Sequence, residues 1–246
     1  MDSFTIQIAG MNACVQPLFA STREYCRGYL TDLQPDFFVE VTAQDLVDTQ
    51  RVLEVEAVEE GIRPRKFPDP FLERATIQRK IATELINGDI LLLHGSTIGL
   101  DGQAYLFTAP CGTGKSTHTR LWREVFGQRA VMVNDDKPFL RITSSCVMAY
   151  GSPWSGKHGL DSNICLPLKG ICFLKRGKEN RIRPISSEEC FDALCAQCYI
   201  PEDVSLRSKA ISLLQSLSMI VPLWEMECTK DPTAAHVSYA AMSGLL

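Results

Sequence analysis

Hydrophobic positions along the chain follow two different spacings, which predicts strands and helices that alternate through most of the sequence. Compact apolar runs of strand length fall at residues 89–93, 103–108, 130–133, 168–174 and 221–228. Apolar residues recur at helical spacing in residues 71–87, 115–126, 187–200, 204–220 and 232–243. Strands separated by helices are typical of an α/β protein, and a chain of 246 residues is long enough to bury one full core of that kind.

The N-terminal part of the chain has a more strand-rich pattern, with apolar segments of β type at residues 4–8, 15–19 and 37–42. Thr42 is typical of a helix start, and the helix predicted after it runs to Gly61. The prolines that then break the chain are Pro64, Pro68 and Pro70. We therefore expect a small β-containing α/β region at residues 1–68 that packs on a core formed by residues 69–246, which ends in helices.

Composition and charge argue against several classes of protein. The formal net charge is −4 at pH 7 and no basic cluster is interleaved with aromatic residues, which argues against binding to nucleic acid. No run approaches the ~20 apolar residues of a membrane-spanning helix, and the N-terminus has no secretion-signal pattern, so we expect a cytoplasmic protein with no membrane partner. The ten cysteines are scattered, and we expect reduced thiols, with Cys190, Cys195 and Cys198 packed in the core rather than holding a metal.

The strongest chemical signal is the sequence APCGTGKST at residues 109–117, between a predicted strand and a predicted helix. This is the context of a P-loop, in which backbone N–H groups and a helix N-terminus bind nucleotide phosphates. Lys115 is placed to reach the β- and γ-phosphates, and the Ser116 hydroxyl to complete the shell of a Mg²⁺ ion. The predicted nucleotide-binding residues are Pro110, Cys111, Gly112, Thr113, Gly114, Lys115, Ser116 and Thr117. The P-loop pattern begins with glycine, whereas this chain has Ala109, which restricts the turn if that residue needs a positive φ.

Ionisable residues end two of the other predicted strands. The strand at residues 130–133 is followed by Asn134, Asp135 and Asp136. In P-loop proteins one acid at such a strand end holds Mg²⁺, and a second acid can accept a proton from an attacking hydroxyl. The strand at residues 89–93 ends in His94, which is either a catalytic residue or a partly buried, hydrogen-bonded one.

The order and spacing of these segments resemble the HPr kinase/phosphorylase and phosphoenolpyruvate carboxykinase group. HGS at residues 94–96 comes first, then APCGTGKST, then NDD at residues 134–136, and the resemblance covers residues 90–177. In that group an HG segment precedes the P-loop by a β-hairpin, and an aspartate pair follows on the next strand. The resemblance implies an α/β fold with a P-loop kinase core of this type.

The same resemblance implies roles for individual residues. Lys115 and Ser116 bind the phosphates and the metal, and His94 supports the reacting groups. One aspartate is the base toward the acceptor hydroxyl and the other binds Mg²⁺. We favour Asp135 as the base and Asp136 as the metal ligand, with the reverse order left open.

The chain also departs from the group's pattern. HPr kinases carry a glycine-rich signature that serves the reverse, phosphorylase reaction, and the corresponding segment here is GSPWSGKHGL at residues 151–160, which echoes it only faintly. Trp154, Lys157 and His158 make this segment either a loop that closes over a substrate or an ordinary surface connection. Phosphoenolpyruvate carboxykinases are much longer, so we do not expect oxaloacetate chemistry.

Taken together, the sequence predicts an ATP- and Mg²⁺-dependent kinase that transfers the γ-phosphoryl group to a hydroxyl. The acceptor predicted is a serine of a peptide or small protein, or else a small hydroxylated metabolite. Two other classes stay open: an ATPase or regulatory module without a phosphate acceptor, and an interaction protein with a vestigial P-loop. A homo-oligomer is expected by analogy with HPr kinases alone.

Overall fold

The computed structural model describes residues 2–59 and 61–244. The chain forms two compact units, Met1–Leu85 and Ile86–Leu246, each with its own internal contacts. The boundary expected near residue 68 would have given helix α3 (Asp69–Ile86) to the core, whereas the contacts assign nearly all of α3 to the N-terminal unit. In the part of the chain that the structure describes, no helix combines the length and the apolar character needed to cross a lipid bilayer.

Within its described residues, the N-terminal unit holds a small sheet of its own and three α-helices. The strands β1 (Phe4–Ile8), β2 (Met11–Gln16) and β3 (Phe37–Glu40) are paired in that order, with β1 and β2 antiparallel. The helical elements are α1 (Ser21–Tyr25), η1 (Arg27–Tyr29), α2 (Ala43–Glu59) and α3. Thr42 begins α2 as predicted, because the Asp45 N–H donates to its hydroxyl (3.2 Å) while its own N–H donates to the Asp45 carboxylate (2.8 Å).

The C-terminal unit contains a nine-stranded mixed sheet in the order β4-β8-β9-β10-β6-β5-β7, with β12 added to β10 and β11 added to β12. The strands are β4 (Ile90–Leu92), β5 (Ser96–Leu100), β6 (Gln103–Thr108), β7 (Ala130–Asn134), β8 (Phe139–Ile142), β9 (Val147–Tyr150), β10 (Cys165–Arg176), β11 (Arg181–Pro184) and β12 (Leu223–Cys228). The helices are α4 (Lys115–Phe126), η2 (Gly127–Arg129), η3 (Gly156–His158), α5 (Ser187–Cys195), α6 (Val204–Ile220) and α7 (Thr233–Ser243). The predicted α/β class is therefore confirmed.

Strand β10 is the longest strand and joins the two halves of this sheet. Its first residues pair antiparallel with β9, and its later residues pair parallel with both β6 and β12. Gly170 sits at the irregularity in the pairing with β6, and a Cβ built there would lie 3.1 Å from the side chain of Met242. Because β10 and β5 flank β6, the strand that leads into the P-loop, the loop is attached to the interior of the sheet.

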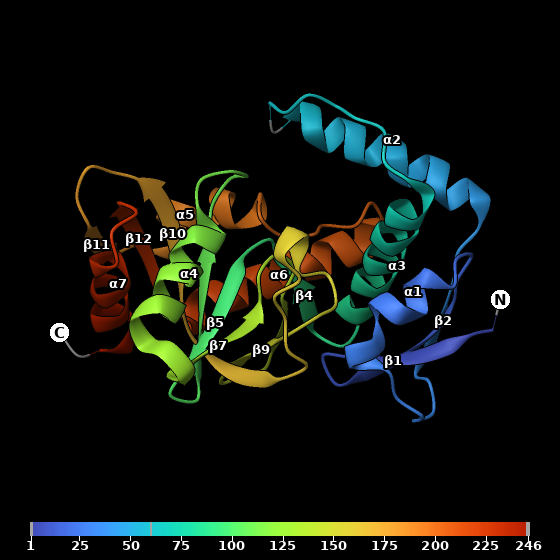
Figure 1. Cartoon of the computed structure of the whole chain (residues 1–246), viewed down its shortest axis with the longest axis horizontal. Helices are drawn as coiled ribbons and strands as arrows, with labels where there is room; N and C mark the ends of the chain where they lie inside the picture. The colour runs from blue at the N-terminus through green and yellow to red at the C-terminus, as the bar shows by residue number, and fades with distance from the viewer. Residues whose placement is uncertain (1, 60, 245–246) are drawn as a thin grey trace. The chain divides into compact units, whose positions relative to one another are not determined.

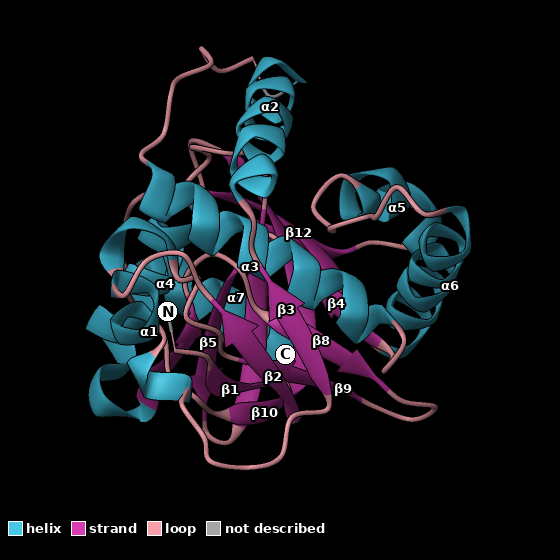
Figure 2. Ribbon diagram, turned by 90° about the vertical axis from the view of Figure 1, so that its right-hand side faces the viewer, coloured by secondary structure: helices cyan, strands magenta, loops and turns pink. Residues whose placement is uncertain are grey.

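Helices cover both faces of the sheet (Figure 2). Alternate residues along β6 and β10 belong to different hydrophobic clusters: Leu106 and Ile171 pack with α5 and α6, whereas Phe107 and Cys172 pack with α4 and α7. This alternation follows from the two-residue period of a strand. Helix α4 lies beside β5 and β7 (Figure 1), and its Trp122 is fully buried against α7. The P-loop helix is therefore held by the core on one side of the sheet.

Several predicted elements have the predicted bounds, and others differ. Residues 103–108, 115–126 and 204–220 form β6, α4 and α6 as expected. Helix α5 ends at Cys195 rather than near residue 200, because the next residues pair with the end of β4: Tyr199 N–H donates to Leu92 O and His94 N–H donates to Gln197 O. The sequence pattern also missed β8, β9 and β11, each only four residues long.

The cysteines are all free thiols. Cys190 is buried, and Cys195 and Cys198 are partly buried against the cluster that includes α5 and α6. Burial raises the pKa of each of these three thiols. They pack as small apolar residues of the core.

Candidate functional site

Strand directions bring the three sequence motifs to one edge of the sheet. Strand β5 is antiparallel to both β6 and β7, so the start of β5 lies where β6 and β7 end. Ser96 is paired with Phe107, and Thr97 with Asn134. The HGS segment, the P-loop after β6 and the aspartate pair after β7 therefore meet at the same edge.

The P-loop has the backbone that its glycines were predicted to provide. Gly112 and Gly114 have φ values of 74° and 129°, which side-chain-bearing residues rarely adopt. Among the described residues, positive φ outside glycine occurs only at Ala9, Asp89 and Asp101, so Ala109 is not in that group. Alanine therefore fits the first position of this loop without backbone strain, and the departure from the P-loop pattern does not distort the turn.

Lys115 is the first residue of α4, and its side chain is buried inside the loop. Its ammonium donates to the backbone oxygen of Ala109 (2.8 Å), so the lysine spans the turn from end to start. Arg176, at the end of β10, holds the loop from outside, donating to Gly112 O (2.6 Å) and Thr113 O (3.4 Å). No sequence motif points to Arg176, because its contact with the P-loop joins residues more than sixty positions apart.

Asp135 is tied to the P-loop helix through two hydroxyls. The residue is 5% exposed, and its carboxylate accepts a hydrogen bond from the Ser96 hydroxyl (2.6 Å). The Ser96 hydroxyl also lies 2.8 Å from that of Thr119, one turn into α4. Ser96 stands inside the HGS segment, which is the only sequence signal that could have singled it out. This chain of contacts places Asp135 beside the helix that carries Ser116.

Asp136 faces the histidine of the HGS segment. Its carboxylate Oδ1 lies 3.3 Å from Nε2 of His94, and the two side chains are 32% and 20% exposed. Burial lowers the pKa of His94 to about 2, helped by the nearby charges of Lys137 and Lys115, so the imidazole is neutral at physiological pH. A neutral imidazole can carry its proton on Nε2 and donate a hydrogen bond from it to the carboxylate.

The same environment acts on the acid. Burial raises the pKa of Asp136; Lys137 and Lys115 oppose this effect, and the charge of Asp135 adds to it. The charge of Lys115 thus acts on both His94 and Asp136. The P-loop lysine, the histidine and the second aspartate therefore belong to one electrostatic environment.

The Asn134 side chain fixes the turn that carries the two aspartates. Its side-chain oxygen accepts from the N–H groups of Asp136 (2.8 Å) and Lys137 (2.6 Å), which closes an Asx-type turn. Its amide donates to the backbone oxygen (2.8 Å) and the hydroxyl (3.0 Å) of Ser152. The residue is fully buried, so the turn that carries the acids is fixed to the loop at residues 151–160.

The loop at residues 151–160 lies against Asp136. Gly156 has a φ of 69°, and a Cβ built there would lie 3.2 Å from Cβ of Asp136. Of the three loop residues predicted to meet a substrate, Trp154 is buried and packs edge-on against Phe139, whereas Lys157 and His158 are exposed. The structure therefore brings the exposed part of the loop, rather than its tryptophan, to the surface beside the acid.

The donor groups of this edge fit Mg²⁺. The candidates are the Ser116 hydroxyl in the first turn of α4 and the two aspartate carboxylates, all oxygen ligands of the kind Mg²⁺ prefers. In the described part of the chain, no three His, Cys, Asp or Glu side chains are grouped as a metal-binding cluster. Mg²⁺ at nucleotide sites needs no such cluster, because it keeps waters and takes phosphate oxygens besides one or two protein ligands.

Comparisons with known proteins give a distant likeness to solved structures. No protein-family model and no curated protein matches the chain. Among solved structures, the chain is similar to the structure of the Hpr(Ser) kinase/phosphatase from Coxiella burnetii, with 10% sequence identity and a TM-score of 0.39. The match covers 63% of this chain and 97% of the other. A likeness at this low identity assigns no role to any residue of the site, so the chemistry of the site follows from its own residues.

Proposed function

We propose that the chain is an ATP- and Mg²⁺-dependent kinase that transfers the γ-phosphoryl group to a hydroxyl, with a serine of a peptide or small protein as the acceptor. The observation that carries the proposal is the edge at which a P-loop with its lysine meets two aspartates and a neutral histidine. Phosphoryl transfer needs little covalent chemistry from the protein; it needs phosphate binding, charge neutralisation and an oriented hydroxyl. Each of these needs has a candidate group at this edge.

The phosphate half of the site is the P-loop. Its N–H groups and the N-terminus of α4 bind the phosphates, and the Lys115 ammonium exchanges the Ala109 oxygen for phosphate oxygens when nucleotide enters. When bound, Mg²⁺ supplies positive charge that offsets the charge developing on the transferred group. Ser116 and one aspartate are its protein ligands in this proposal.

The contacts favour Asp135 for the metal and Asp136 for the base, the reverse of the order favoured from sequence. Asp135 is buried and linked through Ser96 to Thr119 of α4, the helix that carries Ser116. Asp136 is more exposed and has a raised pKa, which brings a carboxylate closer to the strength of a useful general base. It would accept the proton of the acceptor hydroxyl.

His94 positions that base. Because its pKa is held near 2, the ring stays neutral at the pH of catalysis and donates a hydrogen bond to Asp136 without transferring a full charge. A charged imidazolium there would lower the pKa of Asp136 and weaken it as a base. Burial keeps His94 neutral and so preserves the strength of Asp136 as a base.

The proposal is tested by following ³²P from γ-labelled ATP into a library of serine-containing peptides. Lys115→Ala should lose transfer by about two or more orders of magnitude and keep its circular dichroism spectrum, because phosphate charge is left uncompensated. Lys169→Ala is the matched control, since Lys169 is an exposed lysine on β10. Near-normal transfer by Lys115→Ala would overturn the role given to the loop. Release of ³²P only as inorganic phosphate, with every acceptor present, would overturn the kinase.

The two aspartate roles predict different phenotypes. Asp135→Asn should raise the Mg²⁺ concentration needed for half-maximal rate, whereas Asp136→Asn should lower kcat and leave that concentration unchanged. In the wild type, kcat should fall as the pH drops through the raised pKa of Asp136. The opposite pattern in the two Asn variants would restore the order favoured from sequence.

A further inference from the structure

A cavity of about 860 Å³ opens beside the P-loop, away from the aspartate pair. One wall is the loop itself, from Ala109 to Thr113, and the others come from the end of β10, from β11, from β12 and from α5. Small-molecule sites typically enclose roughly 300–1,000 Å³, so the cavity is large enough for a nucleoside. The roles proposed so far leave it unused.

Sheet order places the cavity and the acids on opposite sides of the loop. Strand β6, which leads into the P-loop, has β5 on one side and β10 on the other. The acids follow β7, beyond β5, whereas the cavity lies over β10 and β12. A phosphate chain held in the loop thus has one end near Asp136 and the other near the cavity.

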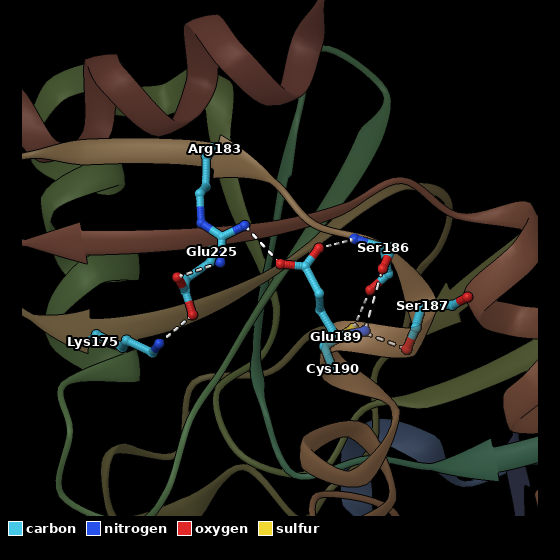
Figure 3. A network of polar contacts seen from close by, with 7 residues as sticks. All are labelled: Lys175, Arg183, Ser186, Ser187, Glu189, Cys190 and Glu225. Atoms are coloured by element: carbon cyan, nitrogen blue, oxygen red, sulfur yellow. Dashed lines mark hydrogen bonds and ion pairs between the residues drawn. The ribbon is translucent and has the colours of Figure 1, made fainter.

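The cavity wall combines an apolar surface with a closed network of ions. The apolar part includes Leu174, Ile185 and Ala193. Arg183 lies between two carboxylates: its Nη1 donates to Glu189 (2.9 Å) and its Nη2 to Glu225 (3.1 Å), as Figure 3 shows.

The network is completed at both ends. The other oxygen of Glu189 accepts from the Ser186 N–H (2.8 Å), and the other oxygen of Glu225 pairs with Lys175 (Figure 3). Hydrogen bonds from Lys175 help to lower the pKa of Glu225, so this carboxylate is ionised at neutral pH. Two cations therefore balance two anions, and the network offers no surplus positive charge to a phosphate.

The arrangement also fixes the plane of the arginine. With donors on both Nη atoms engaged by carboxylates, the guanidinium is held in one orientation, and its flat face remains available for stacking on an aromatic ring. Each carboxylate oxygen retains lone-pair capacity for a further donor such as a sugar hydroxyl. The remaining cation of the lining, Arg176, is engaged by the backbone oxygens of Gly112 and Thr113 in the P-loop. Away from the loop, a partly apolar wall with a flat, charge-balanced cation and free acceptors suits a nucleoside.

We propose that this cavity binds the nucleoside part of the nucleotide, with the base against Arg183 and the apolar wall and the ribose hydroxyls near Glu189 and Glu225. The inference rests on the proposed function, because phosphates in the P-loop fix where the nucleoside begins. It adds a specificity site: nucleoside recognition is separate from phosphate binding and lies on the side of the loop away from phosphoryl transfer.

The test compares MgATP with Mg-tripolyphosphate, which has the phosphates and no nucleoside, by isothermal titration calorimetry. Ala193→Trp places a large ring in the cavity from an exposed helix position, and Ala196→Trp at the end of the same helix is the matched control outside the lining. We expect Ala193→Trp to raise the Kd for ATP about tenfold or more while changing that for tripolyphosphate less than about twofold. Arg183→Ala should weaken ATP in the same selective way, and Ala196→Trp should leave both ligands unchanged.

Equal effects of Ala193→Trp on the two ligands, or no effect on ATP, would overturn the inference and leave the proposed kinase standing. Failure of the wild type to bind MgATP at all would instead overturn the proposed function itself. The two failures are therefore told apart by the wild-type titration.

Discussion

A buried histidine in the P-loop helix predicts a specific loss of stability in mild acid. His118 is 2% exposed, its Nε2 lies 3.0 Å from the Ser238 hydroxyl of α7, and its ring packs 4.4 Å from that of Phe107. Burial lowers its pKa to about 3. In the unfolded chain its pKa returns to about 6.5, so below that pH the unfolded state binds a proton that the folded state refuses. Stability therefore falls as the pH drops from about 6.5 toward 3.

The size of this effect follows from the two pKa values. A histidine that ionises only in the unfolded state costs RT ln(1 + 10^(6.5 − pH)), which is about 0.2 kcal/mol at pH 7.0 and about 1.4 kcal/mol at pH 5.5. We expect the wild type to lose about 1.2 kcal/mol more between these pH values than His118→Gln, which retains a group able to reach Ser238. His94 contributes to both proteins and cancels in the comparison.

Urea unfolding followed by tryptophan fluorescence measures this difference. The tryptophans are Trp122, Trp154 and Trp224, all in the C-terminal unit, so the signal reports on the unit that contains His118. His236→Gln is the matched control, because His236 is an exposed histidine on the same helix as Ser238. Equal losses in the wild type and in His118→Gln would refute the assignment of a buried neutral ring.

Three further substitutions test separate parts of the structure. Gly151→Ala should destabilise the protein by about 2 kcal/mol or more in urea unfolding, because its Cβ would lie 1.9 Å from the backbone oxygen of Ser162; near-wild-type stability would contradict that packing. Ser96→Ala should raise the Mg²⁺ concentration needed for half-maximal rate, since it removes the hydrogen bond that orients the metal ligand Asp135; an unchanged Mg²⁺ requirement would argue against a positioning role. Leu194→Ala should cost about 2–5 kcal/mol in the same unfolding assay, because this fully buried side chain would leave a cavity under α5.

The elements that could be predicted from the sequence are those with strong local signals. An apolar run at residues 103–108 precedes the two glycines of the P-loop, and apolar residues at helical spacing follow them at residues 115–126. These segments form β6 and α4 within the predicted bounds. Strands β8 and β9 are only four residues long and are joined by a short turn. Each is therefore too short to give a recognisable alternation of apolar and polar residues. The end of α5 is set by pairing with residues about a hundred positions earlier, which no local pattern records.

The candidate site divides in the same way. The P-loop, His94 and the aspartate pair stand in motifs that can be identified by order and spacing, and the sheet brings those motifs to one edge. Arg176 and Thr119 act through contacts between distant segments, so neither periodicity nor composition points to them, whereas Ser96 stands inside the HGS segment. Ala109 departs from the P-loop pattern, and only its backbone conformation, which sequence does not specify, shows that a side chain is compatible with this position.

The double pairing of β10 has a consequence for how the chain is made. Its partner β6 is synthesised before it, but β12, which pairs with residues 171–176, begins only at Leu223. Until β12 emerges from the ribosome, the N–H and C=O groups along this edge have no partner and can pair with another nascent chain. A chain cut short before residue 223 would keep the P-loop residues and expose an open strand edge beside them, so we expect such fragments to aggregate rather than to bind nucleotide.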